Sequence, residues 1–75
     1  MGLSSRKNKE DYTTEDLTRW RAMAIAMSEA RRRKVLTAVG FNDTSLGDDL
    51  ENTDNNHKLG VLIYVCRNDE LEARR

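Results

Sequence analysis

The side chains best suited to nucleophilic chemistry in this chain are His57 and Cys66, which are its one histidine and its one cysteine. A Cys–His nucleophile requires the thiol within hydrogen-bond reach of the imidazole, and a separation of nine positions gives no reason for the two to meet. We interpret Cys66 as a buried structural thiol and His57 as a solvated or capping residue in an Asn-rich loop. Neither residue predicts catalysis.

Other catalytic patterns are also missing from the sequence. It has no phosphate-binding glycine loop and no zinc-ligand spacing, and a chain of 75 residues rarely encloses a catalytic pocket. The sequence therefore predicts a protein that is not an enzyme and that binds no cofactor or metal.

Carboxylates crowd the second half of the chain, where they suggest calcium binding. They are Asp43, Asp48, Asp49, Glu51 and Asp54. An EF-hand loop needs oxygen ligands at alternate positions, Gly at the sixth position and Glu at the twelfth. With Gly47 in the sixth position, Leu46 falls on the fifth and Thr53 on the twelfth. The spacing excludes an EF-hand, and we expect these acids to keep the loop soluble or to meet basic residues.

The basic run Arg31, Arg32, Arg33 and Lys34 could contact phosphates or an acidic protein surface. Four consecutive helical residues span about 300° of the helix circumference, so they form a collar and not a single face. The alternative interpretation is a solvated segment near a helix C-terminus, where positive charge is favourable. Trp20 is the lone large anchor on the apolar stripe of the same predicted helix; it is either a core residue or an exposed binding hot spot. These five residues are the candidate partner-binding set.

One long helix is predicted between Tyr12 and Phe41 to carry these residues. Thr13 is typical of an N-cap and Asp16 occupies the third helical position, which together predict a capping box. Tyr12 and Leu17 are spaced for a hydrophobic staple. At the other end Gly40 is typical of a left-handed C-terminal residue, which predicts a Schellman motif.

Apolar residues recur along residues 14–39 with the helical period and predict one buried stripe. The stripe comprises Leu17, Trp20, Ala24, Met27, Val35, Ala38 and Val39, flanked by Ile25 and Leu36. Glu29 and Arg33 are spaced as an i,i+4 ion pair, as are Glu15 and Arg19.

The segment 59–66 is ambiguous between helix and strand. As a helix it places Leu59, Leu62, Ile63 and Cys66 on one stripe; as a strand it is rich in Val, Ile and Tyr. A single strand would leave its backbone groups unpaired, so helix is favoured. The helix would be capped by one of residues 53–55, and Lys58 and Arg67 would flank the apolar run as charged gatekeepers. Before it, residues 42–57 are predicted to be mostly loop, with a short helical turn at Ser45–Asp48 carrying Leu46 and Leu50 inward.

The expected fold is all-α: a long N-terminal helix packed on a shorter C-terminal helix, as a helical hairpin or small bundle. The alternative is α+β with residues 59–66 as a strand. Residues 1–11 are polar and without periodicity, which is typical of a disordered basic tail, and residues 12–75 form a single small domain. No apolar run is long enough to cross a membrane, and the segment Met1–Tyr12 does not resemble a secretory signal. We expect a cytoplasmic protein.

Charge is divided between the two halves of the chain. Residues 1–41 hold nine Lys or Arg against five Asp or Glu, whereas residues 42–75 hold four against eight. This division favours docking within a chain or between copies, and the scarcity of large apolar residues favours a homodimer. We expect a non-enzymatic interaction module that modulates a larger protein. The alternative is a small nucleic-acid-binding regulator using Arg6, Lys7, Lys9 and the 31–34 run against phosphates.

Overall fold

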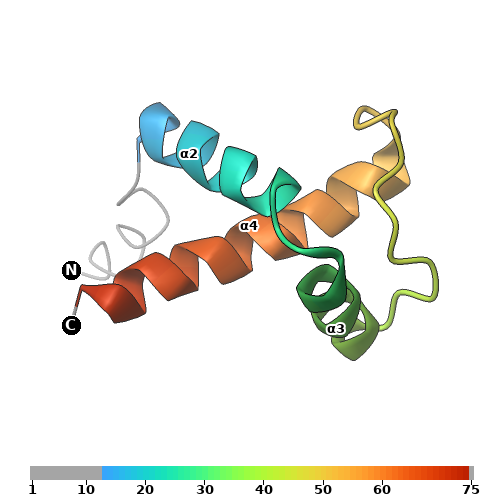
Figure 1. Cartoon of the computed structure of the whole chain (residues 1–75). Helices are drawn as coiled ribbons and strands as arrows, with labels where there is room; N and C mark the ends of the chain where they lie inside the picture. Colours follow the sequence, from blue (N-terminus) through green and yellow to red (C-terminus); the bar gives the residue numbers. More distant parts are fainter. Residues whose placement is uncertain (1–12, 75) are drawn as a thin grey trace, which may run out of the picture.

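The computed structural model describes residues 13–74 and contains three helices there (Figure 1). They are α2 (Thr14–Ile25), α3 (Glu29–Val39) and α4 (Thr53–Ala73). The prediction of an all-α protein is confirmed for these residues. The alternative with residues 59–66 as a strand is wrong, because this segment lies inside α4. The predictions of a tail at residues 1–11 and of a staple between Tyr12 and Leu17 concern residues outside the described part.

The prediction of one uninterrupted helix over residues 14–39 is wrong. The chain leaves the helix after Ala26, and Ser28 is extended, with φ −61° and ψ 150°. Ser28 then caps a second helix, its hydroxyl accepting a hydrogen bond from the Arg31 backbone N–H at 3.2 Å. Glu29 follows in the first turn, where a negative charge is favourable. Ser28-Glu29 is thus a helix start, although the alanines on both sides of it favour a continuous helix.

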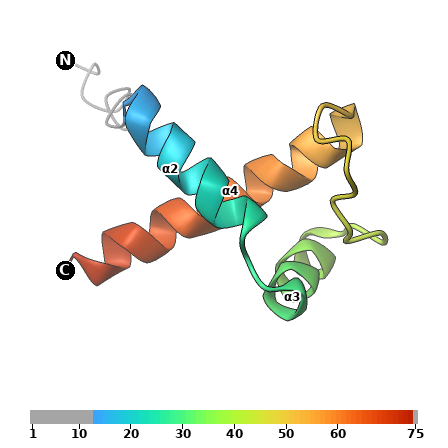
Figure 2. The same cartoon turned by 45° about the horizontal axis from the view of Figure 1, so that its top comes forward.

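The break changes what the first half of the chain can bury. Helix α2 crosses α4 obliquely near the middle of α4 (Figures 1 and 2). If α2 continued straight past this crossing, its later residues would move away from α4. The turn at residues 26–28 brings α3 back, and both α2 and α3 pack against α4 and not against each other. One break therefore converts a rod with a single crossing point into a three-helix unit around α4.

Helix α4 is the longest of the three, which corrects the prediction of a shorter C-terminal helix. It has 21 residues, against 12 in α2 and 11 in α3. Its N-cap is Asn52, one residue before the predicted range, and the Asn52 side chain accepts a hydrogen bond from the Asp54 N–H at 2.9 Å. Within residues 13–74, no helix has both the length and the apolar character needed to cross a membrane.

The start and end predicted for the long N-terminal helix are confirmed as the start of α2 and the end of α3. Thr13 and Asp16 form both reciprocal bonds of a capping box, at 3.2 and 3.1 Å. Gly40 has φ 113°, in the left-handed region, and the N–H of Phe41 reaches back to the Leu36 carbonyl at 3.0 Å. The Gly40 N–H bonds the Thr37 carbonyl at 3.0 Å, which completes a Schellman motif.

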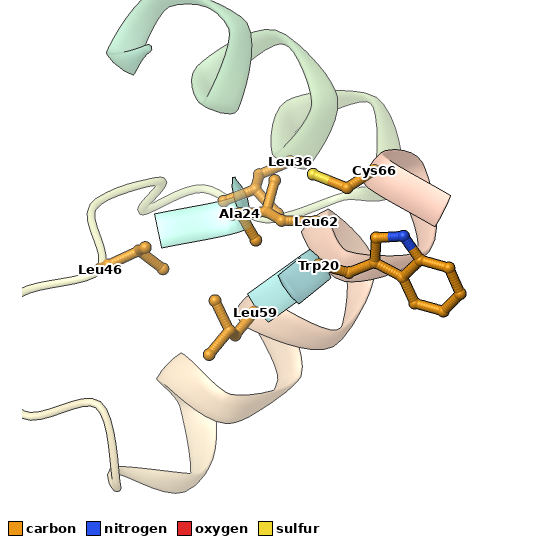
Figure 3. Close-up of a cluster of buried hydrophobic side chains, with 7 residues drawn as sticks. All are labelled: Trp20, Ala24, Leu36, Leu46, Leu59, Leu62 and Cys66. Atoms are coloured by element: carbon orange, nitrogen blue, oxygen red, sulfur yellow. The ribbon is translucent and has the colours of Figure 1, made fainter. Parts of the chain in front are cut away.

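The core gathers where α2 and α3 meet α4 (Figure 3). Its buried members are Trp20, Ala24, Leu36, Leu46, Leu59, Leu62 and Cys66. In α2 the predicted stripe is correct for Trp20 and Ala24, whereas Leu17 is 42% exposed. In α3 the flanking residue Leu36 is buried while Val39 is 57% exposed. The loop supplies Leu46 as predicted, although no helical turn begins at Ser45. Instead Asp43 accepts hydrogen bonds from the Ser45 N–H and hydroxyl.

Candidate functional site

A carboxylate on α4, Glu70, joins α2 to α4. It accepts hydrogen bonds from Arg19 at 3.1 Å on one oxygen and 2.7 Å on the other. The indole Nε1–H of Trp20 donates to the same carboxylate at 3.0 Å, and Arg74 donates at 2.7 Å. Two-point binding of a carboxylate by a guanidinium adds geometric specificity as well as energy. Glu70 therefore sets the position of α2 on α4.

Trp20, the first candidate partner-binding residue, lies inside this junction. Its side chain is 4% exposed, and the Arg19 guanidinium lies over its ring at 5.6 Å from the centroid. Figure 3 shows the indole beside α4 at the edge of the core. Of the two interpretations weighed for Trp20, the structure places it as a core anchor that also carries a hydrogen bond.

The first two members of the basic run are used within the fold. Arg31 donates to Asp69 of α4 at 2.7 Å, which ties α3 to α4. The Nε of Arg32 donates to the backbone carbonyl of Thr44 at 2.9 Å and so holds the start of the long loop. The collar thus meets an acid, as expected, but the acid belongs to α4 and not to the 43–54 loop.

Arg33 and Lys34 point to solvent. Arg33 makes the predicted ion pair with Glu29 at 3.2 Å, between two largely exposed side chains. Such pairs contribute little free energy. Lys34 is exposed, with no ion pair or hydrogen bond from its side chain to any described residue. The structure therefore separates the collar into two positioning residues and two solvent-facing cations.

Lys58, predicted to flank the apolar run as a charged gatekeeper, is instead buried within the fold. Its side chain is 1% exposed, the ammonium donates to the Ser45 carbonyl at 2.9 Å, and the carboxylates of Asp54 and Asp43 lie at 3.3 and 3.7 Å. The aliphatic stem is covered while the charged end meets oxygens. Lys58 therefore fastens the loop to the first turns of α4. The sequence carries one signal for it, the i,i+4 spacing of Asp54 and Lys58.

An open apolar hollow of about 680 Å³ lies between the end of α3 and α4. Its lining residues are Val39, Phe41, Asn56, His57, Gly60, Val61 and Tyr64. Val39 and Tyr64, on its border, are 57% and 60% exposed. The hollow is therefore open to solvent and bordered by apolar side chains from both helices.

Gly60 leaves the floor of this hollow bare. A Cβ atom placed on Gly60 would meet no atom within 4 Å. A second, smaller hollow of about 170 Å³ is also lined by Gly60 and Tyr64, together with Leu17 and Trp20 of α2. Because the two hollows share these residues, they form one surface across α4, which we call the α4 face. It comprises the lining residues of both hollows.

The structure keeps apart the two side chains that the sequence singles out for nucleophilic chemistry. His57 is exposed on the α4 face, whereas Cys66 is buried in the core, and nine residues along one helix separate them by about 13 Å. Burial raises the pKa of the Cys66 thiol, with Asp69 adding to the effect, which disfavours the thiolate needed for nucleophilic attack. Among residues 13–74 no group of three His, Cys, Asp or Glu side chains could hold a metal ion. What the face can do chemically is bury apolar surface.

Acidic residues border the α4 face at one end. Asp54 lies in the first turn of α4, just before Asn56 and His57 of the larger hollow. The loop before it carries Asp48, Asp49 and Glu51, which are exposed and form no ion pair with a described residue. The Asn55 side chain donates to the Asp49 carbonyl at 2.7 Å and holds this acidic segment against α4. Negative charge is therefore fixed beside an apolar hollow.

Neither a family model, nor a curated protein, nor a solved structure matches this chain.

The α4 face was not predicted from the sequence. Val61 and Tyr64 were assigned to an apolar segment, but which of its sides would stay uncovered depends on where α2 and α3 cross. One signal for it is Gly60, which interrupts an otherwise bulky run and, having no Cβ, would suit a close approach.

Acid is expected to loosen the α2–α4 junction. Hydrogen bonds from Arg19 and then Trp20 lower the pKa of Glu70 below its ordinary value. A carboxylate with a lower pKa in the folded state stabilises the fold above its unfolded pKa, about 4.3, and this contribution is lost as the pH falls through the folded value. We expect the free energy of unfolding, measured in urea, to decrease below about pH 4.

Glu70→Gln separates this effect from that of other acids. The variant is expected to be less stable than the wild type at neutral pH and to lose less stability on acidification. Glu72→Gln is the matched control, because Glu72 is an exposed carboxylate on the same helix without an ion pair to a described residue. Parallel pH profiles for Glu70→Gln and the wild type would contradict the assignment.

Proposed function

We propose that this protein is a non-enzymatic docking module of the cytoplasm that modulates a larger protein by binding an apolar segment of it on the α4 face. The observation that carries the proposal is the larger hollow, in which Val39 and Tyr64 stay more than half exposed on either side of bare Gly60. Contiguous exposed apolar surface on a small protein is typical of interaction sites.

The charge around the hollow supports a choice of occupant. The acidic residues at the start of α4 lie beside its His57 end, and within residues 42–74 acids outnumber bases by eight to three. An occupant with apolar side chains and flanking Lys or Arg residues would match both features. We therefore propose a basic amphipathic helix as the docked segment, because grooves of this kind accept the apolar face of a helix.

The scaffold beneath the face supports the same proposal. Glu70 holds α2, Asp69 holds α3 through Arg31, and Lys58 holds the loop against α4. A surface held by hydrogen bonds and ion pairs between its elements loses little conformational freedom on binding, so less of the binding free energy is spent on ordering it.

The probe for this proposal is a synthetic helical peptide with a Leu face and flanking Lys residues, titrated into ¹⁵N-labelled protein. Expected amide shift changes are confined to the residues of the α4 face. The same peptide with Glu in place of Lys should bind more weakly, and added salt should reduce this difference. Absence of shifts up to about 1 mM peptide, where binding is worth only about 4 kcal/mol, would overturn the proposal.

A pair of variants localises the binding. Gly60→Gln places a side chain in the hollow, where a Cβ atom would meet nothing within 4 Å, and it favours helix because Gln has a higher helix propensity than Gly. It should weaken peptide binding about tenfold or more. Met23→Gln is the control, since Met23 is 41% exposed but lines neither hollow. Equal affinities for the two variants would place the docking surface elsewhere.

The same experiment tests the alternative function, in which the partner is a nucleic acid. A mixed-sequence DNA duplex is titrated in parallel. Binding that falls steeply with salt, with shifts centred on residues 31–34, would favour the nucleic-acid-binding alternative and count against the proposal. That alternative would have to use Arg31 and Arg32 despite their contacts with Asp69 and Thr44.

A further inference from the structure

We infer that a second copy of this chain pairs with the α4 face, with Tyr64 of each copy seated over Gly60 of the other, and that this dimer covers the surface used in docking. The inference concerns the regulation of the proposed docking site, and so rests on the proposed function for its biological meaning. The pairing itself rests on the shape and charge of α4.

The first argument is shape. Tyr64 projects from α4 with 60% of its surface exposed, and Gly60 leaves open space one helical turn earlier. Residues four apart lie on the same side of a helix, about 6 Å apart along its axis. A two-fold axis midway between them would place each Tyr64 over the Gly60 of the other copy. A projection and a hole on one stripe are therefore self-complementary, as a two-fold interface requires.

The second argument is continuity. The α4 face runs from Val39 at the end of α3, across Gly60 and Tyr64, to Leu17 on α2. The two-fold axis passes through the middle of this surface, so both of its ends face apolar surface of the other copy. Leu17 and Val39 are among the large apolar residues that a single copy leaves exposed.

The third argument is charge. A two-fold axis across α4 sets the two α4 helices antiparallel, which brings Arg67 of one copy to the first turns of α4 in the other. Arg67 lies over the Tyr64 ring at 5.9 Å and donates to Asn68, and it makes no ion pair with a described carboxylate. The first turns of α4 carry Asp54, which already lies 3.3 Å from the Lys58 ammonium, and they adjoin the loop whose Asp48, Asp49 and Glu51 form no ion pair with a described residue. The antiparallel arrangement thus pairs a cation that lacks an acid with a surface rich in acids.

Sedimentation equilibrium of the full chain over a range of concentrations tests the pairing. The wild type should fit a monomer–dimer equilibrium, and both Gly60→Gln and Tyr64→Ser should raise its dissociation constant about tenfold or more. Gly60→Gln favours helix, so its loss of dimer cannot be attributed to unfolding. Met23→Ser, which removes a similarly exposed apolar side chain outside the face, should leave the equilibrium unchanged. A wild-type monomer up to about 1 mM, or a dimer indifferent to Gly60→Gln, would overturn the inference.

The Lys-flanked peptide distinguishes this inference from the proposed function. If both hold, apparent peptide affinity falls as the protein concentration rises above the dimer dissociation constant, and the peptide dissociates the dimer. Peptide binding by a protein that stays monomeric would overturn the inference and leave the proposed function intact. A dimer that dissociates on Gly60→Gln substitution but never binds the peptide would overturn the proposed function and support the pairing.

Discussion

Trp20→Ala is expected to unfold most of the protein at room temperature. Truncation of a buried Trp costs about 3–5 kcal/mol, and a core in a chain of this size supplies about the same total. Trp20 is 4% exposed and is the one Trp of the chain, packed between α2 and α4. The measurement is urea unfolding followed by far-ultraviolet circular dichroism, in which the variant should lose most of its helical signal before urea is added.

Trp20→Phe is the matched control. It retains an aromatic ring in the core but removes the Nε1–H that donates to Glu70 at 3.0 Å. We expect a folded protein destabilised by about 1–3 kcal/mol, because a hydrogen bond to a charged group is lost and the ring is smaller. A Trp20→Ala variant with wild-type stability would show that this residue is not a core anchor and would return it to the candidate binding residues.

Lys58→Ala is expected to destabilise the protein by about 2–4 kcal/mol. The variant removes a buried aliphatic stem, worth about 0.8 kcal/mol per methylene, and the donor to the Ser45 carbonyl. Asp43 and Asp54 are largely exposed and can be solvated by water, so little is expected from unpaired charge. Urea unfolding at neutral pH measures the change, and amide hydrogen exchange in residues 41–52 shows whether the loop is released.

Lys58→Met distinguishes packing from hydrogen bonding. Met fills much of the same volume, so the loss should shrink to about 1–2 kcal/mol, the cost of a half-buried carbonyl without its donor. Exchange in the loop should still increase, because the contact between α4 and Ser45 is gone. If Lys58→Met matched the wild type in both stability and exchange, the ammonium would have no part in holding the loop.

The candidate site was only partly predictable from the residues. Trp20 could be recognised as an anchor and the basic run as a collar, but the partners that define their roles are remote in sequence. Glu70 lies 50 positions from Trp20, and Asp69 lies 38 positions from Arg31. The α4 face was missed altogether, because a helix with apolar residues on more than one side does not reveal which side its neighbours will cover.

The sequence alone determined several features that depend on residues within one or two helical turns. The capping box at Thr13, the Schellman motif at Gly40 and the Glu29–Arg33 pair all formed as predicted, since each is closed by neighbours along the chain. The all-α class followed from the same local preferences.

Only the tertiary structure decided where the first helix breaks and which polar side chains are buried. Ser28 is compatible with a helix interior as well as with an N-cap, and the cap prevails because the break lets both Ala24 and Leu36 reach α4. Lys58 is buried because α4 and the loop meet there, with the Ser45 carbonyl accepting a hydrogen bond from its ammonium group. Helix ends are set by local hydrogen bonds, whereas burial is set by how helices cross, and the crossing depends on contacts between residues far apart in the chain.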